Sequence, residues 1–329
     1  MKLDDLFGRA GGSITEFRGK NKNCNVFSRK TMNRWEVTEE NKSRCSEEIE
    51  YEGTVERQEF TAVETIHQGF QSLVQLALSN IDQKLYIIKW VPIPPSYTEL
   101  ETSERTNQLR RYPFTPSRET EILQKIEHKN IVKFIKLIQN SNINANGIVL
   151  EYLKMGALND IPNEKVLSDT EISEYFKDIL NGVQYLHSVK IIHRDLNPSN
   201  MLITEDNHLK ITDFSISVEF TGEDALLRGT IGTPEYLAPE CVNASGDVYT
   251  GKPVDVWAMG MTLYWMIYRR PFYNGADKYE VYEAISTQPV IIDDKVSDQY
   301  IRRIFEGIFK INPKERNDIS RLQILIENV

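Results

Sequence analysis

The sequence predicts an α+β fold, in which a β-rich segment is followed by a mainly helical one. Runs of strand-forming residues at 61–66 and 73–78 predict a hairpin, and a similar run at 84–90 predicts a third strand. Farther along, apolar residues recur at helical spacing from 168 to 187. The mostly apolar run 258–268 is too short to cross a bilayer and therefore predicts a buried helix.

Composition limits the classes of function. The chain has 329 residues, 40% hydrophobic and 26% charged, which suits a two-lobed globular enzyme. A net charge of −9 argues against a protein that coats nucleic acid or an anionic membrane. Cys24, Cys45 and Cys241 match no metal-ligand spacing, so free thiols in a reducing compartment are expected. With no apolar export segment at the start and Lys2 after Met1, we expect a cytoplasmic protein, with the nucleus also open to it.

Residues 1–58 contain few large apolar positions and no sustained period. Their charges separate into two blocks. Residues 2–34 hold eight basic and three acidic residues, whereas 36–59 hold nine acidic and three basic ones. Such blocks predict a solvated, poorly ordered tail, and a regulatory or docking role for it stays open.

The first strands lead to a lysine and then to an irregular segment. The turn 67–72 between the first two strands contains Gly69, and the third strand ends on Lys89. Residues 91–118 follow, with five prolines and four arginines. Prolines at this density exclude a helix or a central strand, so we expect a surface insert, either a solvated loop or a partner-binding segment.

A helix is expected to begin near residue 116, where a threonine precedes a proline. Glu119 lies three and four residues before Ile122 and Leu123, which places it on the buried face, whereas Glu121 lies about 200° away at ~100° per residue. A carboxylate on a core face is costly unless it is paired. Lys89 is the natural partner of Glu119.

Further elements complete the two parts. Strands at 131–138 and 148–151 bring the sheet to five strands. Ser168 and Glu171 have the spacing of a capping box and open the long helix that ends near His187. We expect His187 to be a packed core or helix-end side chain.

Polar residues gather between two short apolar runs, 191–192 and 201–203. Asp195 and Asn200 are five residues apart, which allows one to meet a substrate hydroxyl and the other a metal ion. Asp213 follows a further β-like run. Polar loops held at both ends by buried strands are where chemistry usually occurs.

These loops resemble the catalytic and magnesium loops of protein kinases, the H-R-D-x-x-x-x-N and D-F-G signatures. The resemblance implies a two-lobed kinase fold in residues 59–329. Its N-lobe, 59–153, would hold a five-stranded sheet, one main helix and the insert; its C-lobe, 154–329, would be mostly helical.

The resemblance also implies ATP and Mg²⁺ as cofactors. Asp195 would orient or accept the proton of the substrate hydroxyl, and Lys89, held by Glu119, would clamp the phosphates. Asn200 and Asp213 would hold Mg²⁺. The residues expected to surround the nucleotide are Ile66, Gly69, Val74, Ile87, Lys89, Leu150 (as gatekeeper), Glu151, Leu153 and Leu202.

Residues 227–240 resemble the end of a kinase activation segment, with Gly-Thr-Pro-Glu-Tyr in its serine/threonine form. Thr230 and Thr233 lie in it, and Arg194 is expected to meet a phosphate there, at Thr230. His193 is expected to pack on Phe214. Two structural contacts are also expected: Asp255, at the start of the buried helix, with the catalytic loop, and Arg316 with Glu240.

Several runs are similar to one family in particular, the calcium/calmodulin-dependent protein kinase kinases. They are residues 166–187, 218–234 and 251–260, and the proline- and arginine-containing insert has the same place. This resemblance implies a protein substrate, namely the activation loop of another kinase, including AMP-activated-type kinases. Control by calmodulin is not expected, because the chain stops at Val329 soon after the kinase motifs.

Four departures from the kinase pattern keep a second hypothesis open. Asn197 stands where such kinases have a lysine, Ser215 replaces the glycine after Asp-Phe, and Ile87 replaces a small alanine beside adenine. The phosphate loop also keeps one glycine of three. Loss of one preorganised donor costs on the order of 10²–10³ in rate. The alternative to an active kinase is therefore a pseudokinase that acts as a scaffold or allosteric partner.

Overall fold

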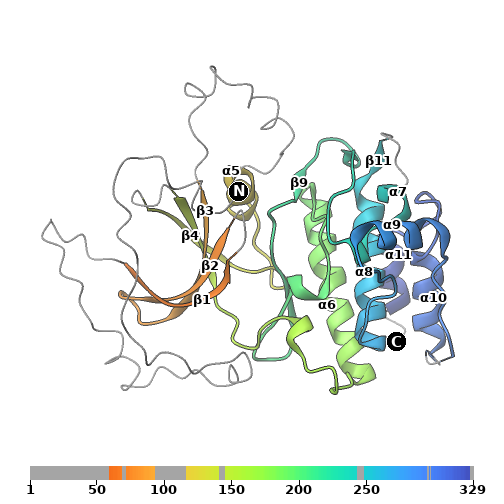
Figure 1. Cartoon of the computed structure of the whole chain (residues 1–329), viewed down its shortest axis with the longest axis horizontal. Helices are drawn as coiled ribbons and strands as arrows, with labels where there is room; N and C mark the ends of the chain where they lie inside the picture. The colour runs from red at the N-terminus through yellow and green to blue at the C-terminus, as the bar shows by residue number, and fades with distance from the viewer. Residues whose placement is uncertain are drawn as a thin grey trace, which may run out of the picture. The chain divides into compact units, whose positions relative to one another are not determined.

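The computed structural model describes residues 59–68, 72–92, 116–140, 145–242, 248–294, 296 and 298–326. The predicted tail 1–58, Gly69 and most of the predicted insert lie outside these residues. The chain divides into two compact units, and Figure 1 labels many of their elements. The sheet unit comprises the strands before residue 96 and residues 135–154; the helical unit comprises residues 96–134 and those from 155 onward.

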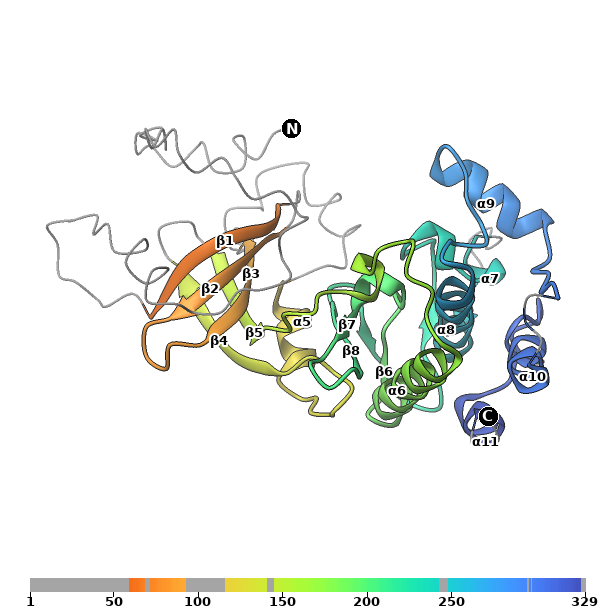
Figure 2. The same ribbon diagram turned by 90° about the horizontal axis from the view of Figure 1, so that it is seen from below.

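The sheet unit confirms the five predicted strands, which are labelled in Figure 2. Their order is β1-β2-β3-β5-β4, and β1–β2, β2–β3 and β3–β5 are antiparallel pairs. One face packs Ala77, Ile88 and Val149 against neighbouring aromatic side chains, which gives the sheet a core of its own. The strands are β1 (Phe60–Gln68), β2 (Leu73–Ser79), β3 (Leu85–Pro92), β4 (Phe134–Asn140) and β5 (Ala145–Glu151).

One strand prediction was wrong at its start. We expected a strand over 131–138, but β4 begins at Phe134. Ile131 instead forms an isolated parallel bridge with Ile211, and Val132 N donates to Ile211 O at 2.9 Å. Both Ile131 and Val132 are 2% exposed. Their apolar character therefore reflects burial in the helical unit, which periodicity does not distinguish from a strand.

The helical unit follows the order α5, α6, short strands and helices of the catalytic region, and then α8 to α11. Residues 116–134, which we expected in the first lobe, group with this unit. Its helices are α5 (Pro116–Leu123), η2 (Leu158–Asp160), α6 (Asp169–Ser188), η3 (Pro198–Asn200), η4 (Pro234–Tyr236), α7 (Pro239–Val242), α8 (Gly251–Tyr268), α9 (Lys278–Thr287), α10 (Gln299–Ile308) and α11 (Ile319–Ile326). Its strands are β6 (Ile191–Ile192), β7 (Met201–Ile203), β8 (Leu209–Ile211), β9 (Val218–Glu219), β10 (Leu226–Leu227) and β11 (Tyr249–Thr250).

Helix α8 forms the centre of this unit, as predicted for an apolar run. It lies beside α6, as Figure 2 shows, and most of its side chains are buried. The helix begins at Gly251, four residues before the expected start at Asp255. A Cβ at Gly251 would approach Ile192 Cγ1 to 2.7 Å, so this position requires a residue without a side chain.

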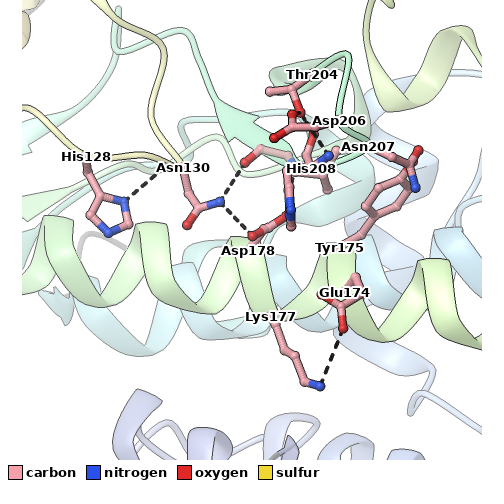
Figure 3. A network of polar contacts seen from close by, with 11 residues as sticks. His128, Asn130, Glu174, Tyr175, Lys177, Asp178, Thr204, Asp206, Asn207 and His208 are labelled. Carbon is pink, nitrogen blue, oxygen red and sulfur yellow. Dashed lines mark hydrogen bonds and ion pairs between the residues drawn. The ribbon is translucent and has the colours of Figure 1, made fainter.

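Asp178, on α6, joins three segments of the helical unit (Figure 3). Its Oδ1 accepts a hydrogen bond from Asn130 Nδ2 at 2.7 Å, and its Oδ2 accepts one from Leu209 N at 2.9 Å. His208 Nδ1 lies 2.9 Å from the same Oδ2. Because Asp178 is 4% exposed, these bonds satisfy a buried carboxylate. They fasten the segment after α5 and the β7–β8 hairpin to α6.

The start of α6 has the predicted capping box. Ser168 Oγ accepts from Glu171 N at 3.2 Å, and the Glu171 carboxylate accepts from Ser168 N at 2.8 Å. That backbone hydrogen bond lowers the pKa of the Glu171 carboxyl. Its contribution to stability is therefore present at neutral pH and is lost as pH falls through the lowered pKa.

We expect Ser168→Ala to reduce the free energy of unfolding by about 1 kcal/mol, the usual cost of losing an N-cap. Urea denaturation followed by circular dichroism measures it. Ser286→Ala is the matched control, because Ser286 is exposed on α9 and alanine is the better helix former. An equal loss of stability in both variants would contradict the capping role.

Among the described residues, no helix is long and apolar enough to cross a membrane. The same part of the chain has no group of three or more His, Cys, Asp or Glu side chains placed to hold a metal ion. Cys241 is a buried free thiol, and burial raises its pKa to about 12. It is therefore an inert core thiol.

Candidate active site

Asp195 lies between β6 and η3, and its carboxylate is held on both oxygens. Oδ1 accepts hydrogen bonds from Thr233 N at 2.8 Å and from Thr233 Oγ1 at 2.6 Å. Oδ2 accepts one from Asn200 Nδ2 at 2.9 Å. These three hydrogen bonds fix the orientation of the carboxylate, and Asp195 is partly exposed to solvent.

Asn197 stands at the position where protein kinases have a lysine. It is 4% exposed, and its Oδ1 accepts from Ser199 N at 2.9 Å as the N-cap of η3. Its Nδ2 donates to Asp195 O and to Thr233 Oγ1, both at 3.1 Å. Asn197 thus links the catalytic loop to the activation segment by hydrogen bonds, but without a charge.

Two residues beside these side chains have left-handed backbones that are uncommon without glycine. Arg194 has a φ of 74° and Asp213 a φ of 64°. Such conformations persist where surrounding contacts over-determine them, often at functional sites. At Arg194 the contact is with α8, because its N donates to Asp255 Oδ1 at 2.9 Å.

Asp255 confirms the expected link between α8 and the catalytic loop. It is 0% exposed, and its Oδ2 accepts from His193 N at 3.0 Å and lies 2.9 Å from His187 Nε2. The two histidines are structural, as predicted. His193 also packs edge-on against Phe214, with ring centroids 5.0 Å apart.

The loop at Asp213 accommodates a serine where kinases have glycine. Ser215 N donates to Asp213 Oδ1 at 3.2 Å. Ser215 is not among the residues with positive φ, so this conformation does not require a glycine at that position. The Ser215 departure is therefore compatible with the backbone that positions Asp213.

The activation segment is held by backbone pairing and by an ion pair. Strand β10 pairs with β11, and Tyr249 OH donates to Gly229 O at 2.5 Å. Gly232 approaches so closely that a Cβ there would lie 2.7 Å from Arg194 O, and its φ of 123° favours glycine. Arg316 pairs with Glu240, N to O 2.8 Å, which confirms the expected contact.

Thr230 and Arg194 were predicted to meet through a phosphate. Thr230 is exposed, and its Oγ1 donates to Cys241 O at 2.8 Å. Arg194 is 8% exposed, and burial lowers the pKa of its guanidinium. The phosphate-mediated contact between them stays a prediction.

A cavity of about 340 Å³ opens beside Asp195 in the helical unit. Residues of the catalytic loop and the activation segment form most of its lining. Asn159, Trp265 and Pro271, which are distant from these loops in sequence, form the rest. The lining residues are Asn159, Asp195, Asn197, Ser199, Asn200, Thr233, Glu235, Tyr236, Trp265 and Pro271. Such a concave site with a few convergent polar groups is the expected place for a substrate.

The nucleotide residues predicted in the sheet unit share one face of the sheet. Val74 is opposite Lys89, and Ile87 is opposite Leu150. Cross-strand partners point to the same side, so these four side chains lie together on the face opposite the aromatic core of the sheet. Val74, Ile87 and Leu150 are apolar and Lys89 is a cation, a combination that suits a purine and its phosphates.

The remaining predicted nucleotide residues have separate positions. Ile66 is 37% exposed on β1, and Leu202 is half-buried on β7 of the helical unit. Glu151 ends β5, and Leu153 follows it. Their roles at the adenine stay predictions.

Lys89 and Glu119 belong to different units. Lys89 is half-buried on β3, and Glu119 is 4% exposed on α5. Glu121, by contrast, is exposed, as the helical period predicts. The ion pair between Lys89 and Glu119 stays a prediction.

The comparison with known proteins identifies the family. The model of the protein kinase domain matches residues 60–324, so the chain belongs to the protein kinase family, and the predicted two-lobed α+β fold is confirmed. Its relatives place it more narrowly. It is a member of the serine/threonine protein kinases, for which ATP is the phosphate donor.

Three relatives illustrate the similarity. A calcium/calmodulin-dependent protein kinase kinase of Caenorhabditis elegans is 32% identical over 290 residues, which are 83% of this chain and 53% of the worm protein. The serine/threonine-protein kinase GRIK1 of Arabidopsis thaliana is 30% identical over 327 residues, 95% of this chain and 78% of the plant protein. The serine/threonine-protein kinase ssp1 of Schizosaccharomyces pombe is 29% identical over 268 residues, 78% and 40% of the two chains. The chain thus spans about half the length of the worm relative.

Several residues of the cavity were not predicted from the sequence. Glu235 and Tyr236 lie two and three residues after Thr233, so their place in the Gly-Thr-Pro-Glu-Tyr run of the activation segment was a usable signal. Trp265 lies within the apolar run that predicted a buried helix, and nothing local distinguishes it from a core residue. Asn159 and Pro271 likewise carry no local signal.

We expect Thr233→Ala to reduce the rate of phosphotransfer about 10–100-fold, because a hydrogen bond to a charged group is worth about 1.5–3 kcal/mol. Thr233→Ser should retain most of the rate, since serine keeps the hydroxyl that donates to Asp195. The measurement is kcat on one peptide at saturating ATP. Equal rates for the alanine variant and the wild type would show that this bond does not orient Asp195.

Proposed function

We propose that the chain transfers the γ-phosphate of ATP to a serine or threonine in the activation segment of another kinase, including AMP-activated-type kinases. One observation carries the transfer itself. The Asp195 carboxylate is oriented by three hydrogen bonds and lines a cavity that suits a substrate side chain. In this position Asp195 orients the incoming hydroxyl and accepts its proton.

The residues assigned to Mg²⁺ fit a hard cation, which prefers oxygen ligands. Asn200 Nδ2 uses its two hydrogens on Asp195, bonding O at 2.8 Å and Oδ2 at 2.9 Å. This orientation leaves Oδ1 of Asn200 as its ligand atom, and Asp213 supplies a carboxylate. When bound, Mg²⁺ neutralises the charge of the phosphates.

The sheet unit supports binding of the nucleotide. Val74, Ile87 and Leu150 supply an apolar surface for the base, and Lys89 on the same face supplies a cation for the phosphates. Glu119 orients Lys89 in this proposal. Ile87, larger than the usual alanine, narrows the space for the base, so we expect weaker binding of ATP than in kinases with alanine there.

Two observations support another kinase as the substrate. Residues 166–187, 218–234 and 251–260 resemble the calcium/calmodulin-dependent protein kinase kinases, and a relative at 32% identity is itself named a kinase kinase. The pseudokinase alternative gains no support from these relatives, which are named as kinases. Asn197 also donates a hydrogen bond to Thr233 of the activation segment and accepts one from Ser199 N within the catalytic loop.

The test uses a catalytically inactive AMP-activated-type kinase domain as substrate, with Mg-ATP and the full chain. We expect phosphate on its activation-segment threonine, found by mass spectrometry, and none on a threonine-to-alanine variant of the substrate. Phosphate only at other sites or on unrelated proteins would overturn the assignment of the substrate. Absence of transfer to any protein, together with absence of ATP binding, would overturn the phosphotransfer.

A further inference from the structure

The cavity beside Asp195 has a lining that phosphotransfer alone does not explain. Asp195, Asn200 and Thr233 belong to the chemistry, but Trp265 and Pro271 form an apolar part of the lining. Among the described lining residues, none carries a positive charge. The cavity therefore contains a surface for a side chain beside the reacting hydroxyl.

Trp265 is a rigid part of this lining. It is 4% exposed, so nearly all of the ring is packed before any substrate arrives. Arg269 lies over the ring, with its Cζ 3.9 Å from the centroid, and its Nη2 donates to Ile161 O at 2.9 Å. Arg269 thus connects the end of α8 to Ile161, the residue directly after η2. Helix η2 itself contains Asn159, another residue of the cavity lining.

The contact between Arg269 and the Trp265 ring influences which substrate side chain the cavity accepts. A tryptophan ring attracts cations to its face, but one face of Trp265 is already covered by the Arg269 guanidinium. A second cation at this ring would be repelled by Arg269. An aliphatic or aromatic side chain meets no such penalty and gains by leaving water.

The position of that side chain follows from the geometry of an extended peptide. Side chains alternate between the two faces of an extended chain, so residues two apart point the same way. If the acceptor hydroxyl meets Asp195, the side chain two positions away points toward the same cavity. The immediate neighbours of the acceptor point away from it.

We propose that this cavity binds an apolar side chain of the protein substrate, two residues from the phosphorylated serine or threonine, and that Trp265 is the residue that selects it. The inference rests on the proposed phosphotransfer and names a class of substrate for it. Glu235 also lines the cavity, so selection of a basic side chain is the opposing outcome.

The first experiment needs only the wild-type chain. A peptide library holds one threonine as acceptor and varies each flanking position among leucine, phenylalanine, glycine, glutamate and arginine. We expect leucine or phenylalanine to raise kcat/KM about tenfold or more over arginine and glutamate at one of the two positions two residues away. A smaller preference is expected at the adjacent positions.

Variants assign the preference to Trp265. Trp265→Phe should keep the apolar preference, because it keeps an aromatic wall. Trp265→Glu should remove it and raise the relative rate for arginine at that one position, leaving preferences elsewhere unchanged. Tyr279→Glu is the matched control, since Tyr279 is a 68% exposed aromatic on α9 of the same unit and should behave as wild type.

A third variant covers the case in which Trp265→Glu does not fold, as judged by its melting temperature. Arg269→Gln keeps Trp265 and removes the cation, so it should weaken the discrimination against arginine several-fold. Turnover with no positional preference, or with a preference for arginine in the wild type, would overturn this inference and leave the phosphotransfer intact. Lack of turnover on every peptide and every protein substrate would overturn both.

Discussion

Asp195→Asn is expected to reduce phosphotransfer by about 10²–10⁴-fold, the usual contribution of a positioned proton acceptor. The amide has nearly the shape of the carboxylate but is a poor acceptor for the proton of the hydroxyl. One of its two positions also becomes a donor, opposite Asn200 Nδ2 or the donors of Thr233. Both the chemistry and the orientation of the side chain are therefore impaired.

The measurement is the initial rate of transfer to the peptide that the wild type phosphorylates best, beside nucleotide affinity from a fluorescent ATP analogue. Binding of the nucleotide should change little, because the hydroxyl and not the nucleotide is the partner of Asp195. Asp294→Asn makes the same chemical change on a fully exposed side chain and should have the wild-type rate. A wild-type rate in Asp195→Asn would mean that another group accepts the proton.

Asp255→Asn is expected to lower the free energy of unfolding by about 3 kcal/mol, because hydrogen bonds to a buried charged group are worth about 1.5–3 kcal/mol each. Asp255 is 0% exposed, and its carboxylate accepts hydrogen bonds from His193 N and Arg194 N. It also lies within hydrogen-bond distance of His187 Nε2. An asparagine has one oxygen, and its NH₂ group would face at least one of these donors. A buried donor without an acceptor is the largest part of the expected loss.

The same change should also reduce the rate of phosphotransfer, since Asp255 holds the left-handed backbone of Arg194 next to Asp195. Urea denaturation gives the stability, and the peptide assay gives the rate. Asp277→Asn is the control: Asp277 is the exposed N-cap of α9, where asparagine caps equally well. If Asp255→Asn unfolds at the wild-type urea concentration, the link between α8 and the catalytic loop does not have the importance we assign to it.

Local patterns in the sequence predicted those elements that depend on near neighbours. Runs of strand-forming residues predicted the strands of the sheet unit, and the Ser168–Glu171 spacing predicted the start of α6. The helical period placed Glu119 inside and Glu121 outside. Each of these signals involves residues within about one helical turn or one strand.

The mistaken strand start at Ile131 is a case that local sequence patterns could not predict. Ile131 and Val132 are buried, and Ile131 bridges to Ile211 of β8, about 80 positions away in the sequence. Whether such an apolar run forms a regular strand depends on this distant partner. The early start of α8 is similar. The helix starts at Gly251, where the backbone passes close to Ile192, a residue far back in the sequence.

The candidate site divides in the same way. Asp195, Asn200 and Asp213 could be assigned from the sequence because their order along the chain resembles the signature loops of protein kinases, and that resemblance implied kinase chemistry. The Asp178 network and the cavity lined by Asp195 and Trp265 were decided only by the tertiary structure. Their members come from segments distant in sequence, and only close packing of the helical unit brings them together.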